Sequence, residues 1–131
     1  MNIGAAAEQS HLPPKTIRYY EDIHLITPHR ADNGYRDYSD EDVHRLRFLQ
    51  RARSLGFTIE ECRALLSLYE DKTRASSDVK AMALHKIEEI EHKMEELRSL
   101  KETLSVLAKR CHGDDRPECP IIDNLAKGPL S

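Results

Sequence analysis

One long charged helix, expected over residues 77–110, constrains this chain more than any other feature. Its apolar residues recur in alternating steps of four and three, which is the spacing of a coiled-coil seam. They are Ala83, Ile87, Ile90, Met94, Leu97, Leu104 and Ala108, with Lys101 in one further slot. A helix of about 33 residues extends about 50 Å, too far for a small head domain to cover this stripe. The stripe therefore needs a partner, and the simplest partner is a second copy of the chain.

The remaining residues provide material for one modest core. With 131 residues the chain has about one domain's worth of sequence. It has no apolar run long enough to cross a membrane, and its first residues lack the features of a signal peptide. We therefore expect a cytoplasmic protein with no membrane partner. The formal net charge of −3 does not by itself reveal or exclude a nucleic-acid binder.

The first 23 residues predict two short helices around a tight connection, over residues 3–10 and 14–23. Pro14 suits the first helical position, which needs no amide hydrogen. Ile17 and Tyr20 share one face of the second helix, so its polar side chains project elsewhere. Such a helix could enter a major groove and contact phosphates or base edges through Lys15, Thr16, Arg18 and Tyr19. A helical hairpin with a solvated basic face is the alternative interpretation.

The segment from Arg30 to Ser39 predicts a hairpin beside that helix. Asn33-Gly34 is a strong signal for a two-residue turn between short strands, which would form a wing. Arg36, directly after Tyr35, would lie at the tip of the wing. The residues expected to contact DNA from the wing are Arg30, Asn33, Gly34, Tyr35, Arg36 and Tyr38.

Two more helices are predicted before the long one. Ser39 can cap the first, with Glu41 or Asp42 in its first turn, and Thr58 with Glu61 forms a capping box for the second. Their apolar residues at helical spacing are Val43, Leu46, Leu49, Ala52, Cys62, Leu65, Leu66 and Leu68. Cys62 is interpreted as a buried core thiol because it lies on this apolar face.

Two cysteines with seven residues between them follow the long helix, in C-H-G-D-D-R-P-E-C-P at residues 111–120. The glycine and prolines stop the helix and let the chain turn back, so that Cys111 and Cys119 can face one point. A structural zinc site usually needs four donors, and here only His112 could be a third, although an exposed loop histidine is the preferred interpretation. Two soft thiolates suit Cu(I). A disulfide or two ordinary thiols are the alternatives.

Two thiolates around a monovalent ion carry a net charge of −1, which favours hydrogen-bond donors close to the sulfurs. Loop amides or a helix N-terminus between Pro120 and Leu125 could supply them. Ile121 and Ile122 could pack over the ion.

Five motifs together are highly specific: I-R-Y-Y-E at 17–21, N-G-Y-R at 33–36, R-A-R-S-L-G-F-T-I-E-E at 51–61, S-D-V-K at 77–80 and C-H-G-D-D-R-P-E-C-P-I-I at 111–122. On these motifs nearly the whole chain resembles the MerR family of transcription regulators, and specifically its copper-efflux, CueR-type members. The resemblance implies a mainly α fold: an N-terminal winged helix-turn-helix with a small two-stranded wing, linking helices, a long antiparallel coiled-coil dimerisation helix and a C-terminal metal-binding loop. The expected parts are a DNA-binding domain (1–69), a linker (70–76), the dimerisation helix (77–110) and the metal loop with the C-terminal segment (111–131).

The resemblance also implies a homodimer that binds a two-fold operator in double-stranded promoter DNA with an overlong spacer. The metal-bound form would distort the DNA so that RNA polymerase can align with both promoter elements, which would activate copper-efflux genes. Cys111 and Cys119 would be the ligands of Cu(I), with Ag(I) or Au(I) also possible. Ser76, from the partner subunit, stands where divalent-sensing relatives carry a third cysteine.

Fewer features of the sequence support other functions. A sensor of the same fold for divalent Zn, Cd, Pb or Hg, or for thiol redox state, is the alternative. A thiol protein that only carries metal would leave the wing unexplained. An enzyme with Cys111 as nucleophile would need a phosphate loop, an acid/base pair or a substrate pocket, and none is legible, so we expect no enzymatic activity.

Overall fold

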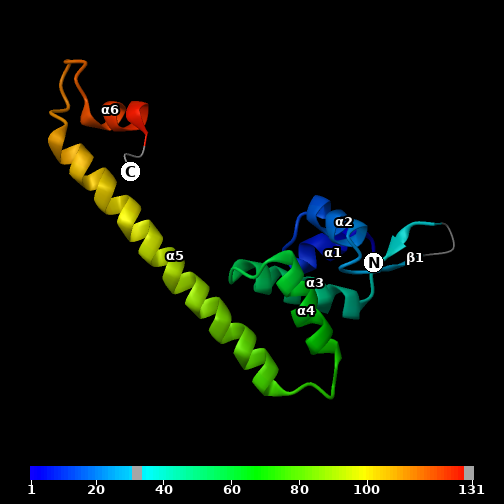
Figure 1. Ribbon diagram of the computed structural model, residues 1–131. Coiled ribbons are helices and arrows are strands. Elements are labelled where there is room, and N and C mark those ends of the chain that lie inside the picture. The colour runs from blue at the N-terminus through cyan, green and yellow to red at the C-terminus, as the bar shows by residue number, and fades with distance from the viewer. Residues whose placement is uncertain (31–33, 129–131) are drawn as a thin grey trace. The chain divides into compact units, whose positions relative to one another are not determined.

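The computed structural model describes residues 1–30 and 34–128. The elements follow in the order α1 (Ile3–Ser10), α2 (Pro14–Asp22), β1 (His29–Arg30), β2 (Arg36–Asp37), α3 (Asp40–Ser54), α4 (Ile59–Glu70), α5 (Ser76–Arg110) and α6 (Pro120–Lys127) (Figure 1). The fold is therefore mainly α with a small two-stranded wing, as the sequence predicts. The chain forms two compact units, Met1–Ala83 and Leu84–Ser131, with their boundary inside α5.

The connection between α1 and α2 is set by local backbone chemistry. Asn2 caps α1, its side chain accepting from the amide of Ala5 at 2.9 Å. His11 ends the helix in the left-handed region, at φ 60°, and the Leu12 amide returns to the carbonyl of Ala7. Pro13 offers no side-chain cap to α2, and its carbonyl instead accepts from the amides of Thr16 and Ile17. The tight turn therefore needs no hydroxyl at position 13.

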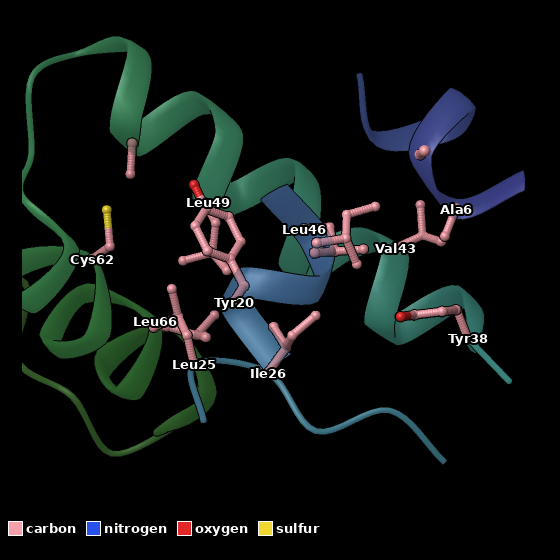
Figure 2. Close-up of a cluster of buried hydrophobic side chains, with 13 residues drawn as sticks. Ala6, Tyr20, Leu25, Ile26, Tyr38, Val43, Leu46, Leu49, Cys62 and Leu66 are labelled. Carbon is pink, nitrogen blue, oxygen red and sulfur yellow. The ribbon is translucent and has the colours of Figure 1, made fainter. Parts of the chain in front are cut away.

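The core of the first unit is formed where α1, α2, α3 and α4 meet (Figure 2). The predicted apolar faces supply most of it, and the segment between α2 and β1 adds Leu25 and Ile26. Cys62 is fully buried, which confirms its interpretation as a core thiol. The buried residues from the predicted faces are Ile17, Tyr20, Val43, Leu46, Leu49, Ala52, Cys62 and Leu66. Complete burial of one such aliphatic side chain contributes about 1.5–3 kcal/mol.

Both predicted capping sites are confirmed. Ser39 accepts from the amide of Asp42 at 3.1 Å, and the Asp42 carboxylate accepts from the amide of Ser39 at 2.9 Å. Thr58 and Glu61 exchange the same two bonds at the start of α4. These reciprocal bonds satisfy amides that have no partner within the helix, and so they fix where α3 and α4 begin.

The predicted two-residue turn of the wing is wrong in its register. A two-residue turn at 33–34 would pair Arg30 with Asp37, whereas the strands pair Arg30 with Arg36 and His29 with Asp37. Residues 31–35 therefore connect the strands; within this connection Gly34 has a φ of 83°. The physical reason lies outside the hairpin, because the carboxylate of Glu21 binds both arginines and holds them opposite each other.

Helix α5 begins at Ser76, one residue before the expected start. Its large seam residues are exposed in the single chain, from 43% for Ile90 to 63% for Met94. No helix within the described ranges is long and apolar enough to cross a membrane.

Candidate metal loop and nucleic-acid interface

The ends of two helices position the predicted thiol pair. Cys111 directly follows the last turn of α5, and Cys119 is the N-cap residue of α6. Their Sγ atoms lie 3.6 Å apart, well beyond the length of a disulfide bond, which is about 2.05 Å, and both thiols are free and half-buried. The loop therefore brings both sulfurs to one point, and a soft metal ion could bind between them.

The first turn of α6 stabilises the thiolate form of Cys119. The backbone N–H of Ile122 is the main cause that lowers the pKa of this thiol, followed by the thiol of Cys111 and the N–H of Ile121. Burial of the thiol and the nearby Asp123 carboxylate act in the opposite direction and raise the pKa. A helix N-terminus favours a thiolate because its amides point at the sulfur. These amides lie within the stretch from Pro120 to Leu125 that the sequence analysis indicated.

Further donors do not gather at the two sulfurs. Within residues 1–30 and 34–128, no group of three or more His, Cys, Asp or Glu side chains is arranged to hold a metal ion. His112 is exposed. Asp114 is occupied by Arg116, whose Nε and backbone N–H donate to it at 2.8 and 3.0 Å, and these bonds lower its pKa. Among the described residues, the soft donors that meet at this point are the two thiols.

Ser76 is the first residue of α5 and is exposed. It belongs to the first unit, whereas the two cysteines belong to the second. Its role beside the metal of a partner subunit stays a prediction.

The polar face predicted for α2 is presented to solvent. Lys15, Arg18 and Tyr19 are exposed and Thr16 is half-buried, while Ile17 and Tyr20 point into the core. Side chains at these positions are therefore available to a DNA groove, because the helix is anchored by its opposite face.

The wing arginines are both bound to Glu21 of α2. Arg30 donates to Glu21 at 3.2 Å and to the carbonyl of Gly34 at 3.2 Å, and Arg36 donates to Glu21 through Nε. Arg36 thus lies in β2 and not at the tip of the wing. Tyr35 is 75% exposed. Asn33, which completes the predicted set, lies outside the described residues.

Tyr38 is a correction to the predicted interface. Its side chain is 1% exposed and belongs to the core, with its hydroxyl 3.5 Å from Glu21. Its backbone exchanges two hydrogen bonds with Met1, which fixes the residue between the wing and α3. A side chain so deeply buried cannot contact a phosphate, so Tyr38 belongs to the core and not to the interface.

Sequence reasoning missed two polar residues that hold this region together. Glu21 binds both wing arginines, and Arg63 of α4 donates to the carbonyls of Ile23 and His24 at 2.9 and 3.2 Å, just beyond the end of α2. A signal for Glu21 was present in the spacing, since it follows Ile17 by four residues and lies on the buried face of the helix. A carboxylate on such a face requires partners.

Comparison with known proteins agrees with this arrangement. The family model described as "MerR HTH family regulatory protein" matches residues 1–68, and that described as "MerR, DNA binding" matches residues 43–107. The chain belongs to the MerR family. This is a family of DNA-binding transcription regulators and not of enzymes, as the sequence predicts.

Two relatives and one solved structure extend the match along the chain. The chain is 62% identical over 128 residues to the HTH-type transcriptional regulator HmrR of Rhizobium leguminosarum bv. viciae, covering 98% of this chain and 99% of that protein. It is 46% identical over 127 residues to the regulator CueR of Salmonella typhimurium, covering 96% and 92%. The transcription regulator PbrR691 from Ralstonia metallidurans CH34, solved in complex with lead(II), matches with a TM-score of 0.82 at 31% identity, covering 95% and 98%.

These matches establish the class of the protein. It is a metal-responsive MerR-family transcription regulator. Regulators of this family bind DNA. The apolar seam of α5 is exposed in the single chain.

Proposed function

We propose that this regulator senses Cu(I), with Ag(I) or Au(I) as possible substitutes, and activates copper-efflux and detoxification genes in the cytoplasm. The observation that carries the proposal is the pair of thiols 3.6 Å apart, with no third side-chain donor gathered around them in the part of the chain that the structure describes. Zinc sites need about four donors, whereas a monovalent d10 ion accepts two thiolates.

The charge balance of the loop supports the same ion. Two thiolates and one monovalent cation leave a net charge of −1, and the amides of Ile121 and Ile122 can stabilise it. Ser76 adds no soft donor from the partner subunit. Cys111 and Cys119 would therefore be the ligands that the described residues supply, and Ser76 would be the position that excludes divalent ions.

The proposed switch acts through DNA shape. A homodimer joined by antiparallel α5 helices would bind a two-fold operator through Lys15, Thr16, Arg18 and Tyr19 of α2, and through the wing. Metal binding would shift the dimer to a form that distorts the promoter spacer, so that RNA polymerase meets both promoter elements. Differential metal affinity for the two forms provides the free energy for this distortion.

The parts of the chain take matching roles in this proposal. Residues 1–69 bind DNA, 70–76 link the domains, 77–110 dimerise, and 111–131 hold the metal.

A divalent-metal sensor is the second candidate. The relative PbrR691 was solved with lead(II), so the fold accommodates a divalent ion in at least one family member. The donor count separates the two candidates, because a divalent ion would need ligands beyond Cys111 and Cys119.

Anaerobic titration of the reduced protein with Cu(I) and then Zn(II), against a competing chelator, tests the proposal. We expect one tightly bound Cu(I) per chain, a thiolate-to-metal absorption band, and no displacement by Zn(II). Cys111→Ser should abolish the band, while the neighbouring control His112→Gln should keep it. Tighter binding of Zn(II) than of Cu(I) would favour the divalent sensor, and the absence of any metal binding would favour a thiol-redox sensor.

A further inference from the structure

The carboxylate of Glu21 lies where α2 meets the wing. Its side chain is 13% exposed, and its two oxygens bind different arginines. Oε1 accepts from Arg30 of β1 at 3.2 Å, and Oε2 accepts from Nε of Arg36 of β2. The hydroxyl of Tyr38 lies 3.5 Å from Oε2. One side chain of α2 thus contacts both strands of the wing and the first residue beyond them.

The register of the wing places two like charges next to this carboxylate. Arg30 and Arg36 are direct cross-strand partners, and like charges in that position destabilise a strand pair. A carboxylate shared between them compensates the repulsion with two charge-assisted hydrogen bonds. The partly buried carboxylate also gains the partners that its desolvation requires.

The same contacts fix how each guanidinium is presented. Arg36 uses Nε for Glu21, and Arg30 uses one terminal nitrogen for Glu21 and the other for the carbonyl of Gly34. A guanidinium is planar, so one such bond sets the plane in which its remaining N–H groups point. The orientation of both wing cations is therefore determined by a residue of α2.

We propose that Glu21 is a positioning residue that orients the two wing arginines for the operator backbone, and that it thereby increases the preference of this regulator for operator over other DNA. This inference rests on the proposed function, in which the wing arginines contact phosphates. Cations held in fixed positions contact the phosphates well only when the bases of the same duplex also fit α2, so they add affinity for the operator. Freely moving cations add the same affinity for any duplex.

Simple electrostatics predict the opposite result, which makes the inference testable. A carboxylate near DNA repels phosphates, so its removal should tighten binding to every duplex alike. Loss of positioning should instead weaken operator binding while binding to a scrambled duplex stays equal or rises. The two effects therefore differ in sign on the operator.

The experiment compares Glu21→Gln with Asp22→Asn, which removes one carboxylate from the next, exposed position of α2. Affinities of the full-length protein for an operator duplex and a scrambled duplex of equal length are measured by fluorescence anisotropy at fixed salt. We expect Glu21→Gln to weaken operator binding about tenfold, the effect of one charge-assisted hydrogen bond, without weakening scrambled binding. Asp22→Asn should change both by the same factor. Equal behaviour of the two variants would overturn the inference.

Three further comparisons serve as controls. Glu21→Asp keeps the charge but is one methylene shorter. Electrostatics alone predict unchanged affinity for both duplexes, whereas positioning predicts weaker binding to the operator only. This variant replaces Glu21→Gln if Glu21→Gln fails to unfold cooperatively on heating. In an Arg30→Gln background, Glu21→Gln should cost less selectivity than in the native chain, because one of its partners is gone. An unchanged cost would overturn the inference. If Arg36→Gln leaves the operator affinity unchanged, Arg36 does not contact the operator, and the wing contact in the proposed function is wrong.

Discussion

The Sγ atoms of Cys111 and Cys119 lie 3.6 Å apart although eight positions separate the two residues in the sequence. One sulfur is held at the end of α5 and the other at the start of α6, so the intervening loop is constrained at both ends. The pair is therefore assembled by the ends of two helices, and the first-turn amides of α6 lower the pKa of the Cys119 thiol.

Replacing either cysteine should separate metal sensing from DNA binding. We expect Cys111→Ser or Cys119→Ser to abolish transcriptional induction by Cu(I) and to leave operator affinity unchanged, because the DNA-binding elements belong to the other compact unit. In vitro transcription and an operator-binding assay measure the two effects. His112→Gln, next to Cys111 in the loop, should behave as the native protein. Loss of operator binding in the cysteine variants would count against the metal-loop assignment.

Removing Arg18 should weaken DNA binding with or without metal. Arg18 is exposed on α2 beside the buried Ile17. If it contacts a phosphate, Arg18→Ala should reduce the slope of log affinity against log salt by about one. Arg98→Ala on α5, which removes an exposed arginine paired with Glu95, should leave the slope unchanged. An unaltered slope in both variants would exclude Arg18 from the interface.

Loss of the hydroxyl at Thr58 should destabilise the first unit. Thr58 accepts from the amide of Glu61 at 3.2 Å, and an N-cap replaced by alanine typically costs about 1 kcal/mol. Denaturant unfolding at fixed protein concentration should show this loss for Thr58→Ala. Thr103→Ala, at an exposed position inside α5, should show no loss, because alanine is the better helix former.

Local signals in the sequence predicted most of this fold. Helix starts at Ser39 and Thr58 depend on side chains three residues away, and core faces depend on helical spacing, so both are visible in short windows. The wing register could not be predicted in this way, because Glu21 reaches Arg30 and Arg36 from nine and fifteen positions earlier. Tyr38 was misassigned for the same reason, since its backbone is held by Met1.

In the candidate site, too, the features set by nearby residues could be predicted and those set by distant residues could not. The spacing of Cys111 and Cys119 around a glycine and prolines indicated that the sulfurs would meet, and they do. Spacing could not indicate that the wing arginines would already be bound within the chain, because their partner comes from another element. Long-range partners of charged residues are the information that a single sequence lacks.

The apolar seam of α5 predicts how the dimer forms. Met94 is 63% exposed in one chain, and burial of this side chain at an interface contributes about 1.5–3 kcal/mol. Met94→Lys should therefore weaken self-association at least about tenfold, as measured by sedimentation equilibrium. His92→Lys, whose parent side chain is 80% exposed and lies off the seam, is the matched control. Equal association of both variants would show that the seam is not the dimer surface.

The identity of residue 76 should set which metals induce. Ser76 has no soft donor, so two thiolates alone would face the ion and divalent metals would lack ligands. We expect Ser76→Cys to broaden the response, so that Zn(II) or Cd(II) also induces transcription. The thiolate-to-metal absorption band should then correspond to three thiolates. Ser77→Cys places the same thiol one position along α5, where it points about 100° away around the helix, and should not broaden the response. If Ser76→Cys keeps the metal profile of the native protein, selectivity resides in the loop itself, in the geometry that the first turn of α6 imposes on Cys119.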